Sequence, residues 1–355
     1  MRHCLLLSLI ILCGNLHGQA PTTLSDRITA TVNRYTSEYD FAGTILVARA
    51  GQPIYQESYG LAYYATPDTL RNNYHYSIAS VTKLFTSIRI LQLVAAGRID
   101  LRQSVGTYLP KLAEAIPADV SIHDLLLHLS GLPEEKSAVY RRVNTPHAIV
   151  AQVLKKNKAG RYGQFNYNNV DYMLLGLVIE AVTGNAWQQE IENAILRPLK
   201  LEQTGFLKYG YYPKNFAYTY RDKGGKLQQD PLFYIENFYA AGSMYSTAND
   251  LLRLDQALYT EKLLGAPEKQ LLAQSYPEYN YAGYSVWNYQ YPFVTAKPTV
   301  MERRGGILGA NVVLVRLTDD NYTIIILSND DRFNPDSFGD EDNLREMLIR
   351  TLYAE

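Results

Sequence analysis

Ser80 and Lys83 form a Ser-x-x-Lys pair at the head of an apolar segment, in the stretch SIASVTKLF. On a helix, residues three positions apart share one face, so the amine and the hydroxyl would be neighbours. A lysine that faces inward is partly desolvated, which lowers its pKa and makes the neutral amine accessible. Such an amine can take the proton of a serine, and the helix N-terminus favours the resulting alkoxide. The pair predicts an acyl-accepting serine, although a capped helix with an unrelated lysine also explains it.

A second candidate segment, FNYNN, precedes another apolar run. Tyr167 lies where a loop enters the predicted helix, so its phenol can be aimed at a site. Near a cationic lysine, a phenol ionises more easily and can act as a general base. Asn169 could orient the lysine or a substrate amide, but the cap of the helix is an equally simple role for it.

A third candidate segment, RRGGI, lies before a predicted strand. Arg304 could bind a carboxylate through two parallel hydrogen bonds. The glycine pair that ends at Gly306 would let a substrate backbone approach closely. An ordinary hairpin with surface arginines accounts for the same residues.

The elements that must position these residues are strands at both ends of the chain and helices between them. Alternation and turn signals predict strands at 42–50, 54–60, 309–317 and 322–327. Helical spacing predicts helices at 80–96, 120–129, 169–183, 186–196, 250–259 and 341–352. This order favours an α+β fold, with one antiparallel sheet built from both chain ends and a mostly helical subdomain, about residues 98–260, inserted between them.

The first twenty residues have the pattern of a secretory signal peptide. A basic start precedes the apolar run CLLLSLIILC, which is too short for a membrane span of about 20 residues. An uncleaved N-terminal anchor is the alternative, and Leu12 before Cys13 disfavours lipid attachment. Cleavage would leave one domain, residues 21–355, with no membrane span. It would also leave no thiol, because Cys4 and Cys13 are the only cysteines, so disulfides and cysteine chemistry are excluded.

The overall composition suits a globular protein. Hydrophobic residues make up 47% of the 355 residues, which is enough for a sizeable core. The formal net charge is −1, and there is no long basic run, so nucleic acid is not an expected partner. Export without disulfides indicates a bacterial periplasmic or secreted protein.

Taken together, the segments resemble the serine β-lactamase-like family, in its branch of class C β-lactamases, D-alanyl-D-alanine carboxypeptidases and related esterases. The resembling segments run in the family's order through nearly the whole predicted mature chain. They are GTILVARAGQPIYQESYG, SIASVTKLFT, SIHDLLLHLSGLP, FNYNNVDYMLLGLVIEAVTG, AAGSMYSTANDLLRL and RGGILGANVVLVR. The resemblance implies a β-lactamase/transpeptidase-like fold.

The resemblance also implies roles for the candidate residues. Ser80 would be the nucleophile, and Lys83 and Tyr167 would share the acid and base roles. Backbone N–H groups of Ser80 and Ile307 would form the oxyanion hole, and Asn169 matches the Tyr-x-Asn position. The family's third motif usually starts with lysine or histidine, whereas Arg304 holds that place here. Arginine keeps the charge but does not give up its proton, which puts efficient β-lactam turnover in doubt.

These patterns predict an exported serine hydrolase that acts, without a cofactor or metal, on D-amino-acid peptides, β-lactams or small esters. Peptidoglycan is one candidate partner besides small substrates. A non-catalytic penicillin- or peptidoglycan-binding protein of the same fold is the alternative. A Ser-His-Asp esterase is a third hypothesis, but the chain has no Gly-x-Ser-x-Gly elbow. His128 is expected to be structural, and no paired ligand spacing of a zinc hydrolase is present.

Overall fold

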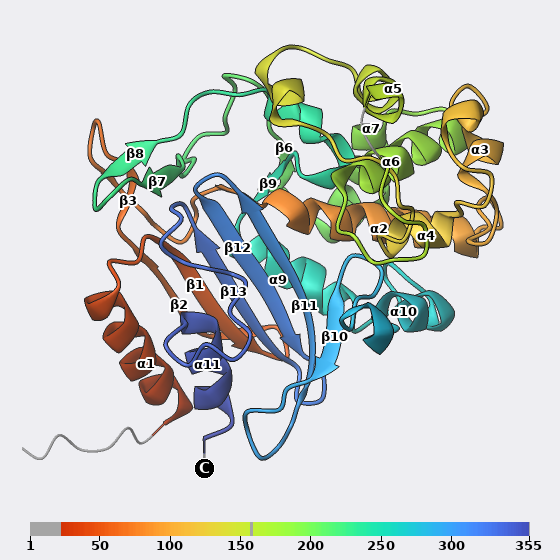
Figure 1. Ribbon diagram of the computed structural model, residues 1–355. Helices are drawn as coiled ribbons and strands as arrows, with labels where there is room; N and C mark the ends of the chain where they lie inside the picture. The colour runs from red at the N-terminus through yellow and green to blue at the C-terminus, as the bar shows by residue number, and fades with distance from the viewer. Residues whose placement is uncertain (1–22, 157–158, 355) are drawn as a thin grey trace, which may run out of the picture.

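The computed structural model describes residues 23–156 and 159–354. The predicted leader and both cysteines lie outside the described residues. Within them, one region is a large sheet with helices on both faces, and the other is a group of helices beside it (Figure 1). The placement of the domain boundaries stays a prediction of the sequence.

The large sheet joins the two ends of the chain, as predicted. Its strand order is β10-β11-β12-β13-β1-β2, and every neighbouring pair is antiparallel. The strands are β1 (Gly43–Arg49), β2 (Gln52–Tyr59), β10 (Trp287–Gln290), β11 (Thr299–Ile307), β12 (Ala310–Leu317) and β13 (Tyr322–Ser328). Ile325 on β13 pairs with Leu46 on one side and Leu314 on the other, so the first and last strands meet at the sheet's centre.

Alternation along the strands divides the core between the two faces of the sheet. Ile45 and Ile326 face α1 (Leu24–Glu38) and α11 (Leu344–Leu352), which lie side by side over one face (Figure 1). Leu46 and Ile325 face the opposite way, into the main cluster that also holds α9 (Ala248–Ala257). Because side chains on a strand point alternately to opposite faces, both faces of these apolar strands are buried.

The helical region is built around α2 (Thr82–Ala95) and α6 (Asn169–Thr183), whose apolar side chains join the main cluster. The other helical segments are η1 (Ala79–Val81), α3 (Val105–Tyr108), η2 (Ala113–Ala115), α4 (Ile122–Leu126), η3 (Ser137–Arg141), α5 (Pro146–Lys156), α7 (Trp187–Ile191), η4 (Glu192–Leu196), α8 (Arg197–Leu199), η5 (Ile235–Ala241), α10 (Ala266–Ala273) and η6 (Pro277–Tyr279). The short strands are β3 (Leu61–Tyr63), β4 (Asp68–Thr69), β5 (Tyr76–Ser77), β6 (Gly205–Phe206), β7 (Tyr220–Asp222), β8 (Leu227–Gln229) and β9 (Met244–Ser246).

The helix predicted at residues 120–129 is the one that differs most from the structure. Residues 120–129 were predicted to be helical, but α4 ends at Leu126. The N-terminus of α4 is well defined, because Ser121 and Asp124 form a capping box. Its end comes early because His128 takes a left-handed backbone conformation, with φ of 60°. The apolar spacing continues past the end of the helix because Leu129 is still buried.

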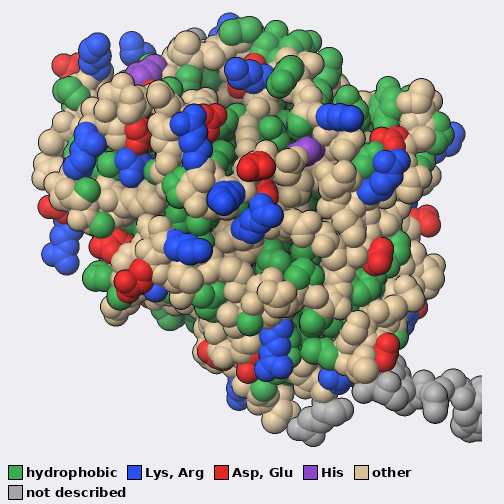
Figure 2. All heavy atoms as spheres, turned by 180° about the vertical axis from the view of Figure 1, so that it is seen from behind, with side chains coloured by type: hydrophobic (Ala, Val, Ile, Leu, Met, Phe, Trp, Pro, Cys, Tyr) green, Lys and Arg blue, Asp and Glu red, His purple; other side chains and the backbone are tan. Residues whose placement is uncertain are grey.

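The surface carries both signs of charge. Figure 2 shows lysine and arginine side chains interspersed with aspartate and glutamate over the rear face, without a continuous region of one sign. Among the described residues, we find no helix with the length and apolar character that a bilayer crossing requires.

Close packing between α6 and η5 generates a stability prediction. A Cβ on Gly176 would lie 2.4 Å from Tyr239 Cε1 and 2.7 Å from Ala240 Cβ. Gly→Ala inside a helix normally stabilises a protein by about 1 kcal/mol. Here we expect Gly176→Ala to lower the free energy of unfolding by about 1–3 kcal/mol because of overpacking, as measured by urea titration.

Gly160→Ala is the control, since a Cβ there meets only atoms at 3.6 Å or more. Its effect should stay within about 0.5 kcal/mol. A Gly176→Ala protein more stable than the wild type would contradict the close approach of α6 and η5.

Candidate active site

Ser80 lies in the turn η1, directly before α2, with strand β11 passing beside it. It is half-buried, whereas Ala79 and Val81 are fully buried. A Cβ on Gly305 would lie 3.0 Å from Ser80 N and 2.6 Å from Ile78 O. Glycine at 305 therefore lets the strand approach the serine backbone closely. The side chain of any larger residue would clash with that backbone and separate the two.

Lys83 is completely buried and points at Ser80. Its Nζ donates to Ser80 Oγ at 3.1 Å, to Asn169 Oδ1 at 2.7 Å and to Ala241 O at 2.8 Å. Burial lowers the pKa of Lys83 to about 8, with the charge of Arg303 acting in the same direction and Tyr167 opposing it. A neutral amine beside the serine hydroxyl is thus accessible near neutral pH.

Tyr167 approaches the same hydroxyl from the loop that precedes α6. Its OH donates to Ser80 Oγ at 2.7 Å and accepts from Arg303 NH2 at 2.6 Å. Burial raises the pKa of Tyr167, but the positive charges of Arg303 and Lys83 and the hydrogen bonds outweigh burial and lower it to about 8. The phenol and the amine are therefore both poised to exchange a proton with Ser80.

The two adjacent arginines of β11 both lie over the Trp287 ring but make different hydrogen bonds. Arg303 is 2% exposed, and its Nε donates to Ser80 O at 2.8 Å. Arg304 does not reach Ser80: its guanidinium bonds Asp336, pairs with Glu302 and lies over the Trp287 ring. The arginine beside the serine is thus Arg303, one residue before the position singled out in the sequence.

Asn169 is free of the capping role that the sequence allowed for it. The N-cap of α6 is Asn168, whose side chain accepts from Val170 N. Asn169 instead accepts from Lys83 and donates its Nδ2 to Glu135 Oε1 at 2.8 Å. Its amide thus links the buried lysine to a carboxylate that the sequence did not single out.

Gly306 and Ile307 continue β11 past Ser80. Both line a pocket of about 770 Å³, together with Glu135 and several aromatic side chains. The pocket therefore opens next to the strand that passes the serine. The contribution of the Ile307 N–H to an oxyanion hole stays a prediction.

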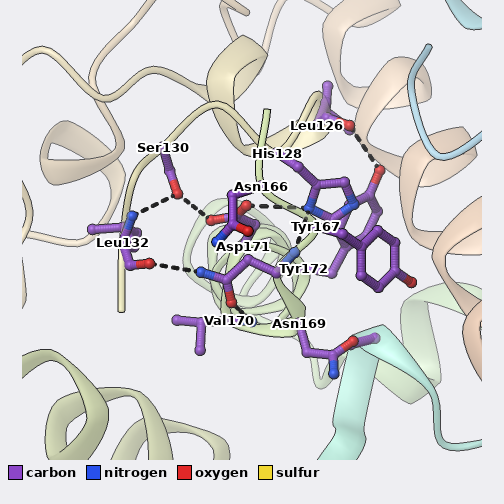
Figure 3. A network of polar contacts seen from close by, with 12 residues as sticks. Leu126, His128, Ser130, Leu132, Asn166, Tyr167, Asn169, Val170, Asp171 and Tyr172 are labelled. Atoms are coloured by element: carbon purple, nitrogen blue, oxygen red, sulfur yellow. Dashed lines mark hydrogen bonds and ion pairs between the residues drawn. The ribbon is translucent and has the colours of Figure 1, made fainter. Parts of the chain in front are cut away.

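His128 lies behind Tyr167 in a buried polar network (Figure 3). Its Nδ1 accepts from Asn168 N at 3.1 Å and lies 3.2 Å from Asp171 Oδ2. With Nδ1 accepting from Asn168, an ionised carboxylate at 3.2 Å would face a second acceptor, so the Asp171 contact favours a protonated carboxyl that shares this nitrogen. Burial raises the pKa of Asp171 well above its ordinary value, which favours that form.

The hydrogen bonds of this network argue against a Ser-His-Asp mechanism that uses Ser80 and His128. Ser130 Oγ donates to Asp171 Oδ1, and burial lowers the pKa of His128 well below its ordinary value. Within the part of the chain that the structure describes, His128 makes no hydrogen bond to Ser80. The Lys83 and Tyr167 side chains, rather than a histidine, occupy the positions next to the hydroxyl.

Known proteins show a clear likeness to this chain. The sequence profile of the Beta-lactamase family matches residues 28–348. The chain belongs to the Beta-lactamase family. The predicted β-lactamase/transpeptidase-like fold is confirmed by the solved structures it resembles.

Among relatives by sequence, the chain is 27% identical to a teichoic acid D-alanine hydrolase of Staphylococcus aureus, over 84% of this chain and 72% of that protein. It is 24% identical to penicillin-binding protein 4* of Bacillus subtilis, over 82% of this chain and 69% of that protein.

Among solved structures, FmtA from Staphylococcus aureus superposes with a TM-score of 0.79 at 23% identity, over 93% of this chain and 90% of that one. D-amino acid amidase from Ochrobactrum anthropi superposes with a TM-score of 0.77 at 18% identity, over 93% of this chain and 98% of that one.

The shared influence of Arg303 on Lys83 and Tyr167 generates a pH prediction. We expect the rate of Ser80 phosphonylation by a neutral fluorophosphonate, with loss of fluoride, to increase as the pH rises through about 8. The coupled pair must lose one proton before it can accept that of the serine. Arg303→Gln removes a charge that lowers both pKa values, so the inflection should move to higher pH. Stopped-flow labelling across the pH range measures it.

Arg304→Gln is the matched control and should leave the inflection in place, because that guanidinium is held by Asp336 and Glu302. Equal shifts in the two variants would contradict the assignment of Arg303.

The buried carboxyl generates a second prediction. Asn at 171 can accept from Ser130 and donate to His128, as a protonated Asp171 does. At about pH 4, close to the unfolded pKa of the carboxyl, we expect Asp171→Asn to change the unfolding free energy by less than about 1 kcal/mol, and Asp171→Ala to cost about 2–4 kcal/mol. Urea titration measures both.

The difference in stability between Asp171→Asn and the wild type should also depend on pH. When folding raises the pKa of a carboxyl, the free energy of unfolding falls as the pH rises above the carboxyl's pKa in the unfolded chain, which is about 3.9. Asp171→Asn lacks this cost. Its free energy of unfolding should therefore rise relative to that of the wild type between about pH 5 and about pH 7. A loss of several kcal/mol that grows with pH would indicate an ionised Asp171 instead.

Proposed function

We propose that this protein is an exported serine hydrolase that forms an acyl-enzyme on Ser80. The observation that carries the proposal is the position of Ser80 Oγ, 3.1 Å from Lys83 Nζ and 2.7 Å from Tyr167 OH. A hydroxyl held between two groups of lowered pKa has a base for its proton on either side.

In the proposed reaction, Ser80 Oγ attacks the substrate carbonyl while its proton passes to the Lys83–Tyr167 pair. The pair then gives a proton to the leaving oxygen or nitrogen as its bond to the carbonyl carbon breaks. Water, losing a proton to the same pair, attacks the ester on Ser80 and releases the acid, and Ser80 regains its proton. The positive charge of Arg303 stabilises the phenolate form of Tyr167 throughout.

The names of the relatives support the choice of substrates. One acts as a teichoic acid D-alanine hydrolase, and a structural neighbour is a D-amino acid amidase. We propose D-amino-acid esters and amides as the substrate class, beside the β-lactams and small esters expected from the sequence. The penicillin-binding relative and the predicted leader support a place at the bacterial cell wall, in the periplasm or outside the cell.

Covalent labelling tests the proposal. The protein is incubated with a fluorophosphonate and, separately, with a fluorescent penicillin, and the labelled peptide is identified by mass spectrometry. We expect label on Ser80 from at least one probe, and none on Ser80→Ala. Lys83→Ala should slow labelling by about 100-fold or more, since a general base contributes about 10²–10⁴-fold.

Labelling of a folded protein at a residue other than Ser80 would contradict the proposal. Permanent penicillin label on Ser80, with no hydrolysis of D-alanyl or simple esters, would favour the alternative of a non-catalytic penicillin-binding protein.

A further inference from the structure

Glu135 occupies a position that the proposed mechanism does not use. Its Oε1 accepts from Asn169 Nδ2 at 2.8 Å and from Tyr140 OH at 2.7 Å. Its Oε2 has no hydrogen-bond partner among the described residues, and the residue is half-buried. The carboxylate is therefore fixed in place through one oxygen while the other is left for a ligand.

Glu135 is also close to the reacting group. Ser80 Oγ, Lys83 Nζ, the Asn169 amide and Glu135 Oε1 form a chain of three successive hydrogen bonds, of 3.1, 2.7 and 2.8 Å. Glu135 therefore belongs to the same hydrogen-bonded cluster as Ser80, the residue to which an acyl group would be attached.

The pocket beside Glu135 has aromatic walls. It extends from Gly306 and Ile307 on the strand beside Ser80 to Glu135 and Tyr140. The Tyr140 ring stacks on Phe238 at a centroid distance of 3.9 Å, and Phe233 meets Phe238 edge-on. A carboxylate beside aromatic faces suits a cationic amine, which gains both a charged hydrogen bond and a cation–π contact.

We infer that Glu135 binds a positively charged amine on the acyl part of the substrate, so that the site selects aminoacyl esters or amides over uncharged acyl groups. The inference rests on the proposed function and adds a specificity-determining residue to it. Arg141, the guanidinium that lines the described pocket, is exposed and lies on the same wall, η3, as Tyr140. Like charge disfavours a place for the amine at Arg141, and Glu135 is the carboxylate of the same pocket lining.

A different role for Glu135 makes a different prediction. The carboxylate could serve only to orient Asn169 and Tyr140, in which case its loss would affect every substrate alike. Glu135→Gln separates the two roles, because the glutamine oxygen still accepts both hydrogen bonds while the negative charge is gone.

The test compares two phenyl esters, of D-alanine and of propionic acid, which differ only in the ammonium group. We expect Glu135→Gln to lower kcat/KM for the D-alanine ester by about 10- to 100-fold, and for the propionic ester by less than about threefold. Glu134→Gln, the same charge change one residue away, should alter the ratio of the two by less than about twofold. Ser80→Ala supplies the background rate.

A binding measurement makes the test independent of turnover. In the Ser80→Ala background, we expect calorimetry to show D-alanine amide binding about 10- to 100-fold more weakly when Glu135→Gln is added. Equal losses on both esters, or no change in amide binding, would overturn the inference. An unlabelled Ser80 with intact, Glu135-dependent amide binding would instead overturn the proposed hydrolase and leave the amine site standing.

Discussion

The burial of the Lys83 amine is the constraint on which the rest of the site depends. A completely buried ammonium is costly unless each of its donors finds an acceptor. Ser80, Asn169 and Ala241 supply those acceptors, each from a different part of the chain. The same burial lowers the pKa of Lys83. These hydrogen bonds keep the lysine in place, and desolvation lowers its pKa into the range that its proposed role as a proton carrier for Ser80 needs.

Backbone geometry on both sides of the lysine is unusual for the residue types present. Ala79, directly before Ser80, has φ of 44°, and Tyr239, two residues before the Ala241 carbonyl, has φ of 47°. Such conformations cost about 1–3 kcal/mol each in non-glycine residues and persist only where packing enforces them. Both residues are buried, and α6 and β11 approach them through Gly176 and Gly305. The tight packing therefore holds the serine turn and the carbonyl acceptor against the lysine.

Much of this arrangement could be predicted from the sequence, because it depends on local periodicity and on residue types. The strands at both chain ends form one sheet, and Ser80, Lys83, Tyr167 and Asn169 come together. The choice between Arg303 and Arg304 depends on which face of β11 meets Ser80. The sequence placed RRGGI before a strand, whereas it lies within β11, so the face on which each arginine lies could not be predicted.

The position of Glu135 beside Asn169 could not be predicted from the sequence for a related reason. It follows the SGLP turn without any periodic signal, and only the folded chain brings it to Asn169. The early end of α4 was equally hidden, because the left-handed backbone at His128 leaves the apolar pattern intact. Contacts between segments distant in sequence decide all these features.

Ionisation of Tyr167 tests the central claim most directly, because the charges of Arg303 and Lys83 must hold its phenol near pKa 8. The near-ultraviolet absorbance of tyrosinate, taken as the difference between the wild type and Tyr167→Phe over a pH titration, isolates this one phenol. The account predicts a single tyrosinate with a midpoint of about 8. A difference spectrum with no tyrosinate below about pH 10, the ordinary pKa of tyrosine, would contradict it.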